Sequence, residues 1–264
     1  MEYLLQQPYT EDLLGRTMSE ARLYHDLAWT WEILVSQEEY VPETEFVKKV
    51  VQKHKKIPGN DLLDVGCGGG HHDLFLKSDF KIVGVDKNEQ MLEFARRRNP
   101  EIEYHPGDMR TFQLDRKFDV ILAMDTIMYN LTYANMEKTL ANFSGHLQTG
   151  GVMIFSLEDL KEKFEQNKTK FKKHRKGDLE AVLIENQYDP NPDDTEYEYH
   201  LIFLIREKGN FRIEVDLHRM GLFELDRVQL ILEKLNFRSY LYELDFSGRE
   251  YQTEGPIFVC EKAE

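Results

Sequence analysis

The chain of 264 residues is 41% hydrophobic, which is enough for a substantial core and excludes a protein that is disordered throughout. Its 34 Lys and Arg residues against 48 Asp and Glu residues give a net charge of −14, so nucleic acid and membrane surfaces are disfavoured as partners. An acidic N-terminus without a leader-like apolar stretch, together with two cysteines that lack disulfide or metal-site spacing, predicts a cytoplasmic protein.

Helices come first along the chain, and strands then alternate with helices. Apolar residues recur every three or four positions over residues 11–55, which is typical of helices, and we assign 11–57 to an N-terminal helical cap. The apolar run at 62–65 ends in glycines and predicts a buried strand. Further strands, separated by helical stretches, are predicted at 81–86, 102–105, 118–124 and 152–157. The alternation predicts a parallel sheet covered by helices on both faces.

The alternation breaks after residue 157. Apolar and polar residues then alternate as in antiparallel strands, at 180–188, 195–207 and 210–220. We therefore assign 158–222 to an inserted antiparallel β platform. A helix and two strands follow, at 225–235, 239–246 and 256–260. No linker separates these parts, so we expect a single domain over 1–264.

Residues 64–70 have a sequence that suits a nucleoside ligand. They read DVGCGGG between a buried strand and a helix, where glycines let the backbone approach a ligand. The spacing departs from the GxGxxG of dinucleotide-binding turns, because His71 stands in place of the third glycine. Asp86, at the end of the second strand, can accept hydrogen bonds from ribose, and Asp108 with Met109, after the third, suits adenine. Consecutive strand ends thus describe a site for adenosine.

The motifs DLLDVGCGGG, KIVGVD, YHPGDMRTF, FDVILAM and GGVMIF, in this order, resemble those of class I S-adenosylmethionine-dependent methyltransferases over residues 60–157. The resemblance implies a Rossmann-like α/β fold with a seven-stranded, mainly parallel sheet whose last strand is antiparallel. It implies S-adenosylmethionine as cofactor. The residues expected to bind or orient it are Asp64, Gly66, Cys67, Gly68, Asp86, Lys87, Asp108, Met109 and Met124.

A narrower similarity concerns the acceptor. The segment GDMRTFQLDRKFDVI, the platform strands and Ser247-Gly248-Arg249 are similar to small-molecule N-methyltransferases, notably those that act on amino sugars. The similarity implies a small-molecule acceptor, with nitrogen preferred over oxygen. It puts Asn130, with Tyr129 beside it, where a His or Tyr faces the substrate amine, and it puts Tyr24 or His25 at an early tyrosine, of which we favour Tyr24.

Methyl transfer from a sulfonium needs little acid or base help, because the leaving group is neutral and alignment does most of the work. For an amine acceptor, a His or Tyr can assist loss of a proton or orient the nitrogen. Tyr24, Tyr129 and His218 are the candidate catalytic residues. Each can instead be an ordinary packing residue of the cap, the sheet or the platform. Arg249 can contact a substrate phosphate or carboxylate, or sit in a surface turn.

Two other functions stay open. The chain can be a non-catalytic S-adenosylmethionine-binding module that forms a homodimer through the platform. It can also be an aminopropyl transferase on the decarboxylated cofactor, for which Asp125 is a suitable acid. No metal site is predicted, because His71 and His72 are adjacent and have no third ligand at a useful spacing.

Overall fold

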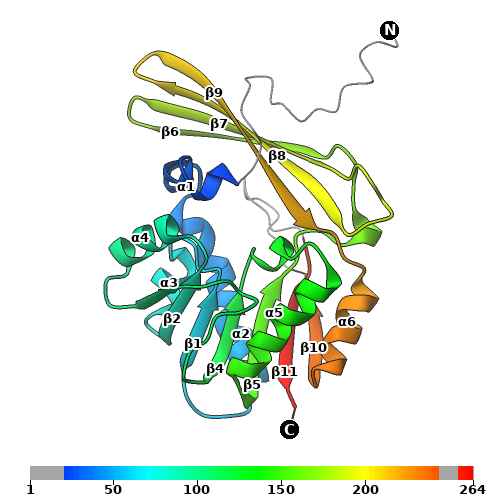
Figure 1. Ribbon diagram of the computed structural model, residues 1–264. Helices are drawn as coiled ribbons and strands as arrows, with labels where there is room; N and C mark the ends of the chain where they lie inside the picture. The colour runs from blue at the N-terminus through cyan, green and yellow to red at the C-terminus, as the bar shows by residue number, and fades with distance from the viewer. Residues whose placement is uncertain (1–20, 244–254, 264) are drawn as a thin grey trace.

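The computed structural model describes residues 21–243 and 255–263 and contains two sheets, one above the other (Figure 1). The larger sheet has seven strands in the order β10-β11-β5-β4-β1-β2-β3. Their bounds are β1 (Asp61–Val65), β2 (Lys81–Asp86), β3 (Glu103–Pro106), β4 (Phe118–Ala123), β5 (Leu147–Ser156), β10 (Phe237–Tyr242) and β11 (Ile257–Lys262). β11 is antiparallel to both its neighbours, and the remaining neighbouring pairs are parallel. The predicted Rossmann-like fold is confirmed.

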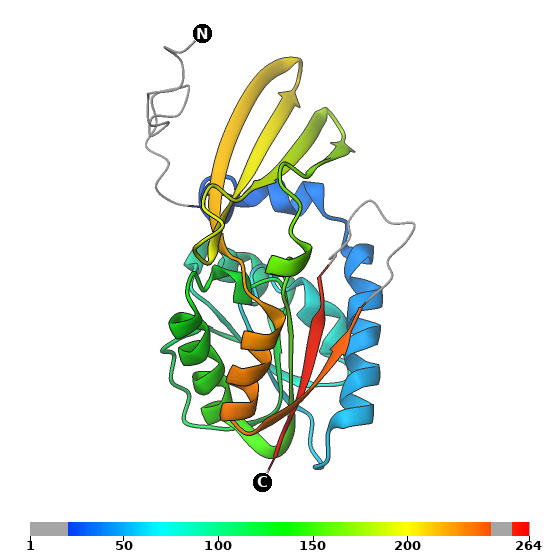
Figure 2. The same ribbon diagram turned by 90° about the vertical axis from the view of Figure 1, so that its right-hand side faces the viewer.

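Helices cover both faces of this sheet because its strands are apolar on both sides. In β1, Leu62 lies in one hydrophobic cluster with Val47 and Val50 of α2 (Val41–His54). Leu76 of α3 (His71–Leu76) belongs to the same cluster. The next residue, Leu63, lies in the cluster that holds α5 (Tyr133–His146) and α6 (Leu225–Lys234). Figure 2 shows α2 on one side of the sheet and α5 and α6 on the other. A further helix, α4 (Glu89–Arg98), packs on β2 and β3.

The upper sheet is the platform, and it has four antiparallel strands rather than the three that the sequence predicts. They are β6 (Thr169–Lys176), β7 (Leu179–Tyr188), β8 (Glu196–Glu207) and β9 (Asn210–Gly221), paired in this order. β6 is the additional strand. Its basic residues hide the alternation, since Phe171 is exposed while the neighbouring Lys172 is buried.

Short helical segments of the cap lie between the two sheets. They are η2 (Arg22–Tyr24), α1 (Ala28–Leu34) and η3 (Gln37–Tyr40), and Figure 1 shows α1 directly below the platform. Leu23, Leu27 and Leu34 pack against the inward-facing Leu183 and Phe203 of the platform. The predicted helix before residue 21 lies outside the described residues. Within the described parts of the chain, no helix is both long and apolar enough to cross a membrane.

One boundary differs from the expected one. The strand β5 begins at Leu147, directly after α5 ends at His146, whereas the sequence predicts a strand from 152. Leu147 pairs with Phe118, and the register shifts between Phe118 and Val120. β5 therefore includes Gly150 and Gly151, and its pairing with β4 is irregular at this point.

Candidate functional site

The glycine loop after β1 and the carboxylate after β2 form one unit. Gly66 and Gly68 have φ angles of +73° and +51°, which side chains rarely allow, and a Cβ on Gly66 would collide with Thr126. The N–H of Gly68 donates to Asp86 Oδ2 at 2.9 Å, and the N–H of Asn88 donates to Asp86 Oδ1 at 2.7 Å. The loop backbone is therefore held in place by Asp86, whose pKa is raised by burial.

A cavity of about 600 Å³ opens beside this unit. The sequence-predicted cofactor residues on its wall are Gly66, Gly68, Asp86, Lys87, Asp108 and Met109. Arg110 donates to both oxygens of Asp108, at 2.8 Å and 2.5 Å, and this pairing lowers the pKa of Asp108 to about 2. Asp108 is thus an ionised acceptor at the strand end. The cradle, the acids and the size of the cavity fit an adenosine group.

Asp64 does not line this cavity wall, although the resemblance associates it with the cofactor. It is buried beside Asp73, and burial followed by the repulsion from Asp73 raises its pKa strongly. Tyr104 Oη donates to Asp73 Oδ2 at 2.7 Å. The two carboxyls are thus buried close together in the core, away from the cavity.

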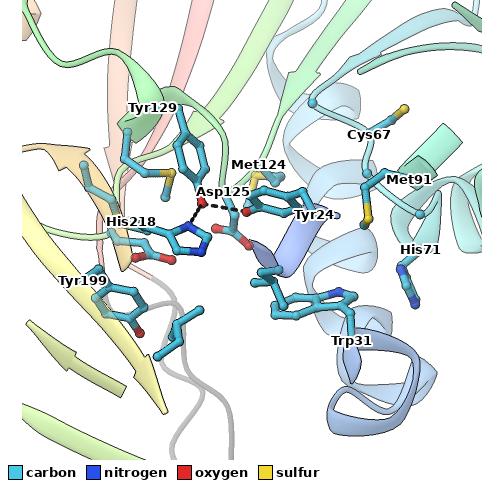
Figure 3. Close-up of a pocket in the computed structure, with 18 of the residues that line it drawn as sticks. Tyr24, Trp31, Cys67, His71, Met91, Met124, Asp125, Tyr129, Tyr199 and His218 are labelled. Atoms are coloured by element: carbon cyan, nitrogen blue, oxygen red, sulfur yellow. Dashed lines mark hydrogen bonds between the residues drawn. The ribbon is translucent and has the colours of Figure 1, made fainter. Parts of the chain in front are cut away.

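A second cavity, of about 120 Å³, lies between the glycine loop, the cap and the platform. Cys67 and Met124, predicted to contact the cofactor, lie on its wall together with Trp31 of α1 and Leu183 of β7. The residues that line both cavities are Tyr24, Gly66, Gly68, Asp125 and Tyr129. Figure 3 shows Tyr24, Tyr129 and Asp125 close together at the centre of this site.

The three candidate catalytic residues form one hydrogen-bonded chain. Tyr24 Oη lies 2.7 Å from Tyr129 Oη, and Tyr129 Oη lies 2.8 Å from His218 Nδ1. The chain continues to a residue that the sequence analysis missed, because His218 Nε2 lies 2.8 Å from Asp216 Oδ2. Burial raises the pKa of Tyr24 and of Tyr129 far enough to keep both hydroxyls protonated at neutral pH. Cap, loop after β4 and platform thus each contribute to one polar network.

Strand register explains why the platform contributes to this network. Tyr199 of β8 pairs with His218 of β9, and Leu201 pairs with Asp216. Residues two apart on a strand share a face, so Asp216 and His218 both point toward the cap. This alternation is the one signal in the sequence that could have linked Asp216 to the site.

Carboxylates surround the second cavity. Asp125 follows β4 with a φ of +50°, and its Oδ1 accepts from Ser156 Oγ at 3.0 Å. Burial raises the pKa of Asp125 to about 6. Burial also raises the pKa of Glu158 to about 8, with further repulsion from Asp125, Asp159 and Glu185. Glu158 and Glu185 line the cavity, and the sequence analysis missed both. The arrangement favours a positively charged occupant.

Asn130 and Arg249 are the two residues that the sequence predicts to contact the substrate. Asn130 lines the larger cavity, where its amide donates to Ile127 O at 3.0 Å and its carbonyl accepts from Thr139 Oγ1 at 2.9 Å. The amide is therefore engaged within the protein, and Tyr129 is the neighbour that lines the second cavity. Arg249 lies outside the described residues.

The paired histidines have other partners. His71 stacks on Tyr40 with ring centroids 4.8 Å apart, and desolvation lowers its pKa to about 3. His72 Nε2 lies 2.9 Å from Glu43 Oε2. Both rings thus fasten the start of α3 to the cap and to α2.

Comparison with known proteins confirms the fold and the resemblance of the core. Residues 62–151 match the family model of a methyltransferase domain. The dTDP-3-amino-3,4,6-trideoxy-alpha-D-glucopyranose N,N-dimethyltransferase of Streptomyces venezuelae is 35% identical over 118 residues, which are 44% of this chain and 49% of that protein. The chain thus spans about half the length of the curated relatives it matches.

Solved structures extend the likeness to nearly the whole chain. The structure of DesVI from Streptomyces venezuelae superposes with a TM-score of 0.78 at 23% identity, over 93% of this chain and 99% of the other. CalS10, an amino pentose methyltransferase from Micromonospora echinaspora solved with bound S-adenosylmethionine, gives a TM-score of 0.74 at 21% identity, over 90% and 96%. At this level of identity the structures establish a shared fold that includes the platform.

Proposed function

We propose that this protein is a methyltransferase that transfers the methyl group of S-adenosylmethionine to the nitrogen of a small-molecule amine. One observation carries the proposal. A cavity that fits adenosine and a second, acid-lined cavity meet at a wall formed by Tyr24, Tyr129 and Asp125. A methyl donor in the first cavity and an amine acceptor in the second would face each other where the two cavities meet, beside these three residues.

The larger cavity supplies the contacts for the cofactor. The open backbone at Gly66 and Gly68 would run along its methionine part, Asp86 would accept from its ribose, and Asp108 with Met109 would hold its adenine. S-adenosylmethionine, when bound, supplies an electrophilic methyl group on a sulfonium. The residues of this chain therefore have to hold and align the two partners rather than activate the methyl carbon.

The second cavity supplies the contacts for the acceptor. Asp125, whose pKa of about 6 leaves it mostly ionised at neutral pH, would attract the acceptor as an ammonium ion and take up the proton that it must lose before its lone pair can attack. The Tyr24 hydroxyl, at the junction of the two cavities, would orient the neutral nitrogen. An alcohol acceptor gains less from this ring of carboxylates, which is why we propose nitrogen.

The sequence relatives support an amino sugar as the acceptor class. The matching protein of Streptomyces venezuelae is named for methylation of a nucleotide-linked amino sugar. The family model of a methyltransferase domain, at residues 62–151, covers the strand ends that form the larger cavity. The acid-lined second cavity agrees with an amino group as the reacting part of such a sugar.

We also propose that the protein forms a homodimer through the outer face of the platform. Residues in register on neighbouring strands form apolar rows across this face. One row holds Phe171, Ile184, Ile202 and Val215, and the next holds Leu204 and Ile213. Phe171 and Ile213 are 67% and 46% exposed. An exposed apolar sheet face of this kind is suited to pack against its own copy.

The experiment that tests the proposal mixes the purified protein with S-adenosylmethionine and a panel of amines, including dTDP-linked amino sugars and simple amino sugars. Release of S-adenosylhomocysteine together with a product 14 Da heavier by mass spectrometry is the expected result. Binding of S-adenosylhomocysteine by calorimetry without turnover on any amine would favour a non-catalytic module. Release of methylthioadenosine from the decarboxylated cofactor would instead identify an aminopropyl transferase.

A further inference from the structure

Asp216 connects the cap to the polar chain of the acceptor site. Its Oδ2 accepts the N–H of Leu23 at 2.7 Å and lies 2.8 Å from His218 Nε2, and its Oδ1 accepts the N–H of Arg22 at 2.9 Å. The side chains of Asp216 and His218 are each only 1% exposed. One buried carboxylate thus holds both the first turn of η2 and the ring of His218.

We propose that Asp216 is a positioning residue of the acceptor site: it sets the direction of every hydrogen bond from His218 to Tyr24, so that the Tyr24 oxygen accepts the N–H of the acceptor amine. The inference rests on the proposed amine methylation. It adds a residue that touches neither of the two cavities and acts only through His218 and the cap.

The direction follows from what each group can donate. A carboxylate has no proton to give, so His218 Nε2 carries the proton in its bond to Asp216. Nδ1 of the neutral ring is then an acceptor, and the hydroxyl of Tyr129 donates to it. With its proton used in this way, Tyr129 accepts from the Tyr24 hydroxyl. The remaining lone pairs of the Tyr24 oxygen are left for the cavity.

The opposite direction would hinder the reaction. If Nδ1 carried a proton, it would donate to Tyr129, Tyr129 would donate to Tyr24, and the Tyr24 hydroxyl would point its proton into the cavity. A donor there would occupy the lone pair with which the acceptor nitrogen must attack the methyl group. An oxygen that accepts the N–H leaves this lone pair free and aims it.

The contacts of Asp216 with Arg22 and Leu23 link the direction of the hydrogen bonds to the packing of the cap on the platform. Tyr24 is the last residue of η2, and the first two N–H groups of that turn end on Asp216. If the cap leaves the platform, Tyr24 moves away from Tyr129 and Asp216 loses two of its donors. The hydroxyl and the imidazole are therefore aligned together only when the cap is closed over the cavities.

The test compares Asp216→Asn with the wild-type enzyme. The Asn carbonyl in the place of Oδ1 can still accept the N–H of Arg22, while its N–H₂ in the place of Oδ2 donates to Nε2 and moves the proton onto Nδ1, which reverses the chain and removes the acceptor of the Leu23 N–H. We expect kcat/KM for the amine to fall roughly 10-fold to 100-fold. The Kd for S-adenosylhomocysteine should stay within about twofold, since Asp216 does not line the larger cavity.

A measurement that does not depend on turnover reports the tautomer directly. In ¹⁵N NMR of the labelled protein, His218 should show a protonated Nε2 and an unprotonated Nδ1 in the wild type, and the two should exchange roles in Asp216→Asn. If the wild-type ring carries protons on both nitrogens, or on Nδ1 alone, the inference is wrong even if the enzyme methylates amines. If the tautomer is as expected but no amine is methylated, the proposed function fails instead.

Glu214→Gln is the matched control on the same strand. Glu214 binds the guanidinium of Arg22 at 3.0 Å, so this variant weakens a cap contact without touching His218. We expect its His218 signals and its kcat/KM to stay close to those of the wild type. A loss of activity in Glu214→Gln equal to that in Asp216→Asn, with unchanged tautomers in both, would mean that Asp216 merely anchors the cap, and would overturn the proposal.

Discussion

Gly66 shows how a single missing side chain shapes the larger cavity. Its φ of +73° lies in the left-handed region, and a Cβ built on it would collide with the Thr126 side chain after β4. The glycine therefore does two things at once, because it permits the turn and leaves room at the junction of the two cavities. Thr126 cannot move aside to make room for a Cβ at position 66, because its own side chain is buried.

We therefore expect Gly66→Ala to weaken binding of S-adenosylhomocysteine by about 2 kcal/mol, or roughly 30-fold, through strain in the loop. Titration calorimetry measures this directly. The matched control is Gly145→Ala in α5, where a Cβ meets no heavy atom within 4 Å. Its affinity should equal that of the wild type. Unchanged affinity in Gly66→Ala would contradict the placement of the cofactor.

The carboxyls that line the two cavities lower the stability of the folded protein when they are ionised. Burial raises the pKa of Asp86, of Asp125 and, most strongly among these, of Glu158, to about 8. An acid whose pKa is higher in the folded state than in the unfolded state favours folding while it is protonated. Its contribution is complete below its unfolded pKa and is lost as the pH rises through the folded value.

Glu158→Gln should remove part of this pH dependence. Below pH 4.5, the ordinary pKa of a glutamate, wild type and variant should be equally stable, and the wild type should lose on the order of 2 kcal/mol relative to the variant by pH 9. The groups that face Glu158 are Asp125, Asp159, Glu185 and Lys170, and the substitution leaves all of them in place. Urea unfolding of the ligand-free protein at several pH values provides the measurement.

The control for this prediction is Glu93→Gln, an exposed position on α4. Its stability should follow the wild type at every pH. If Glu158→Gln runs parallel to the wild type as well, then Glu158 is not the group whose ionisation is suppressed by burial.

At the scale of elements, the cap is fastened at two points on opposite sides of the cavities. Its first turn is tied to β9 through Asp216 and Glu214. Its helix α1 is tied to the glycine loop, because Glu32 accepts both a 2.6 Å and a 2.5 Å hydrogen bond from Arg98, whose other nitrogen donates to the carbonyl of Gly69. The position of the cap is thus linked to the conformation of the loop that would hold the cofactor.

Arg98→Lys tests this link, because an ammonium group cannot span Glu32 and Gly69 with the fork of a guanidinium. We expect S-adenosylhomocysteine to dissociate about fivefold faster from the variant, as measured by stopped-flow fluorescence. Arg97→Lys is the control, since Arg97 is stacked on Phe94 on the exposed side of α4. Equal dissociation rates in the wild type and Arg98→Lys would show that the cap does not retain the cofactor.

The elements differ in how well their sequence predicts them. β1, β2 and β4 are buried on both faces, so a short and mostly apolar run marks each of them. β6 was missed because it lies at an edge of the platform, where basic side chains replace apolar ones on both faces. β5 begins earlier than predicted because its first residues pair with Phe118, a contact that no local pattern contains.

At the scale of the whole molecule, the site joins residues that are far apart in the chain. The predicted cofactor residues Asp86 and Asp108 meet in one cavity because they follow consecutive strands, whose ends must come together at one edge of a parallel sheet. Tyr24, Tyr129 and His218 were chosen separately, and nothing in the sequence indicates that their hydrogen bonds connect, over 105 and 89 residues. Glu158 and Glu185 could not be found, because a carboxylate becomes unusual only when the fold buries it.

The outer face of the platform gives a prediction for the assembly. Ile213→Lys places a charge on the apolar face, on the edge strand β9, and we expect it to convert a homodimer into a monomer in sedimentation equilibrium at micromolar concentration. Leu230→Lys on α6, a site that is 61% exposed and remote from the platform, should leave the dimer intact. A wild-type protein that sediments as a monomer would show that this face does not pair with its own copy.

The way the second cavity is enclosed bears on how such proteins diversify. Its floor is formed by loops and helices that follow strands of the seven-stranded sheet, but its roof comes from the cap and the platform, which contribute no strand to that sheet. Substitutions in the cap and the platform can therefore change which acceptor fits the second cavity, while the larger cavity below keeps its residues. Proteins that share this donor site would on this account differ mainly in the residues of β7, β8 and β9 that line the second cavity.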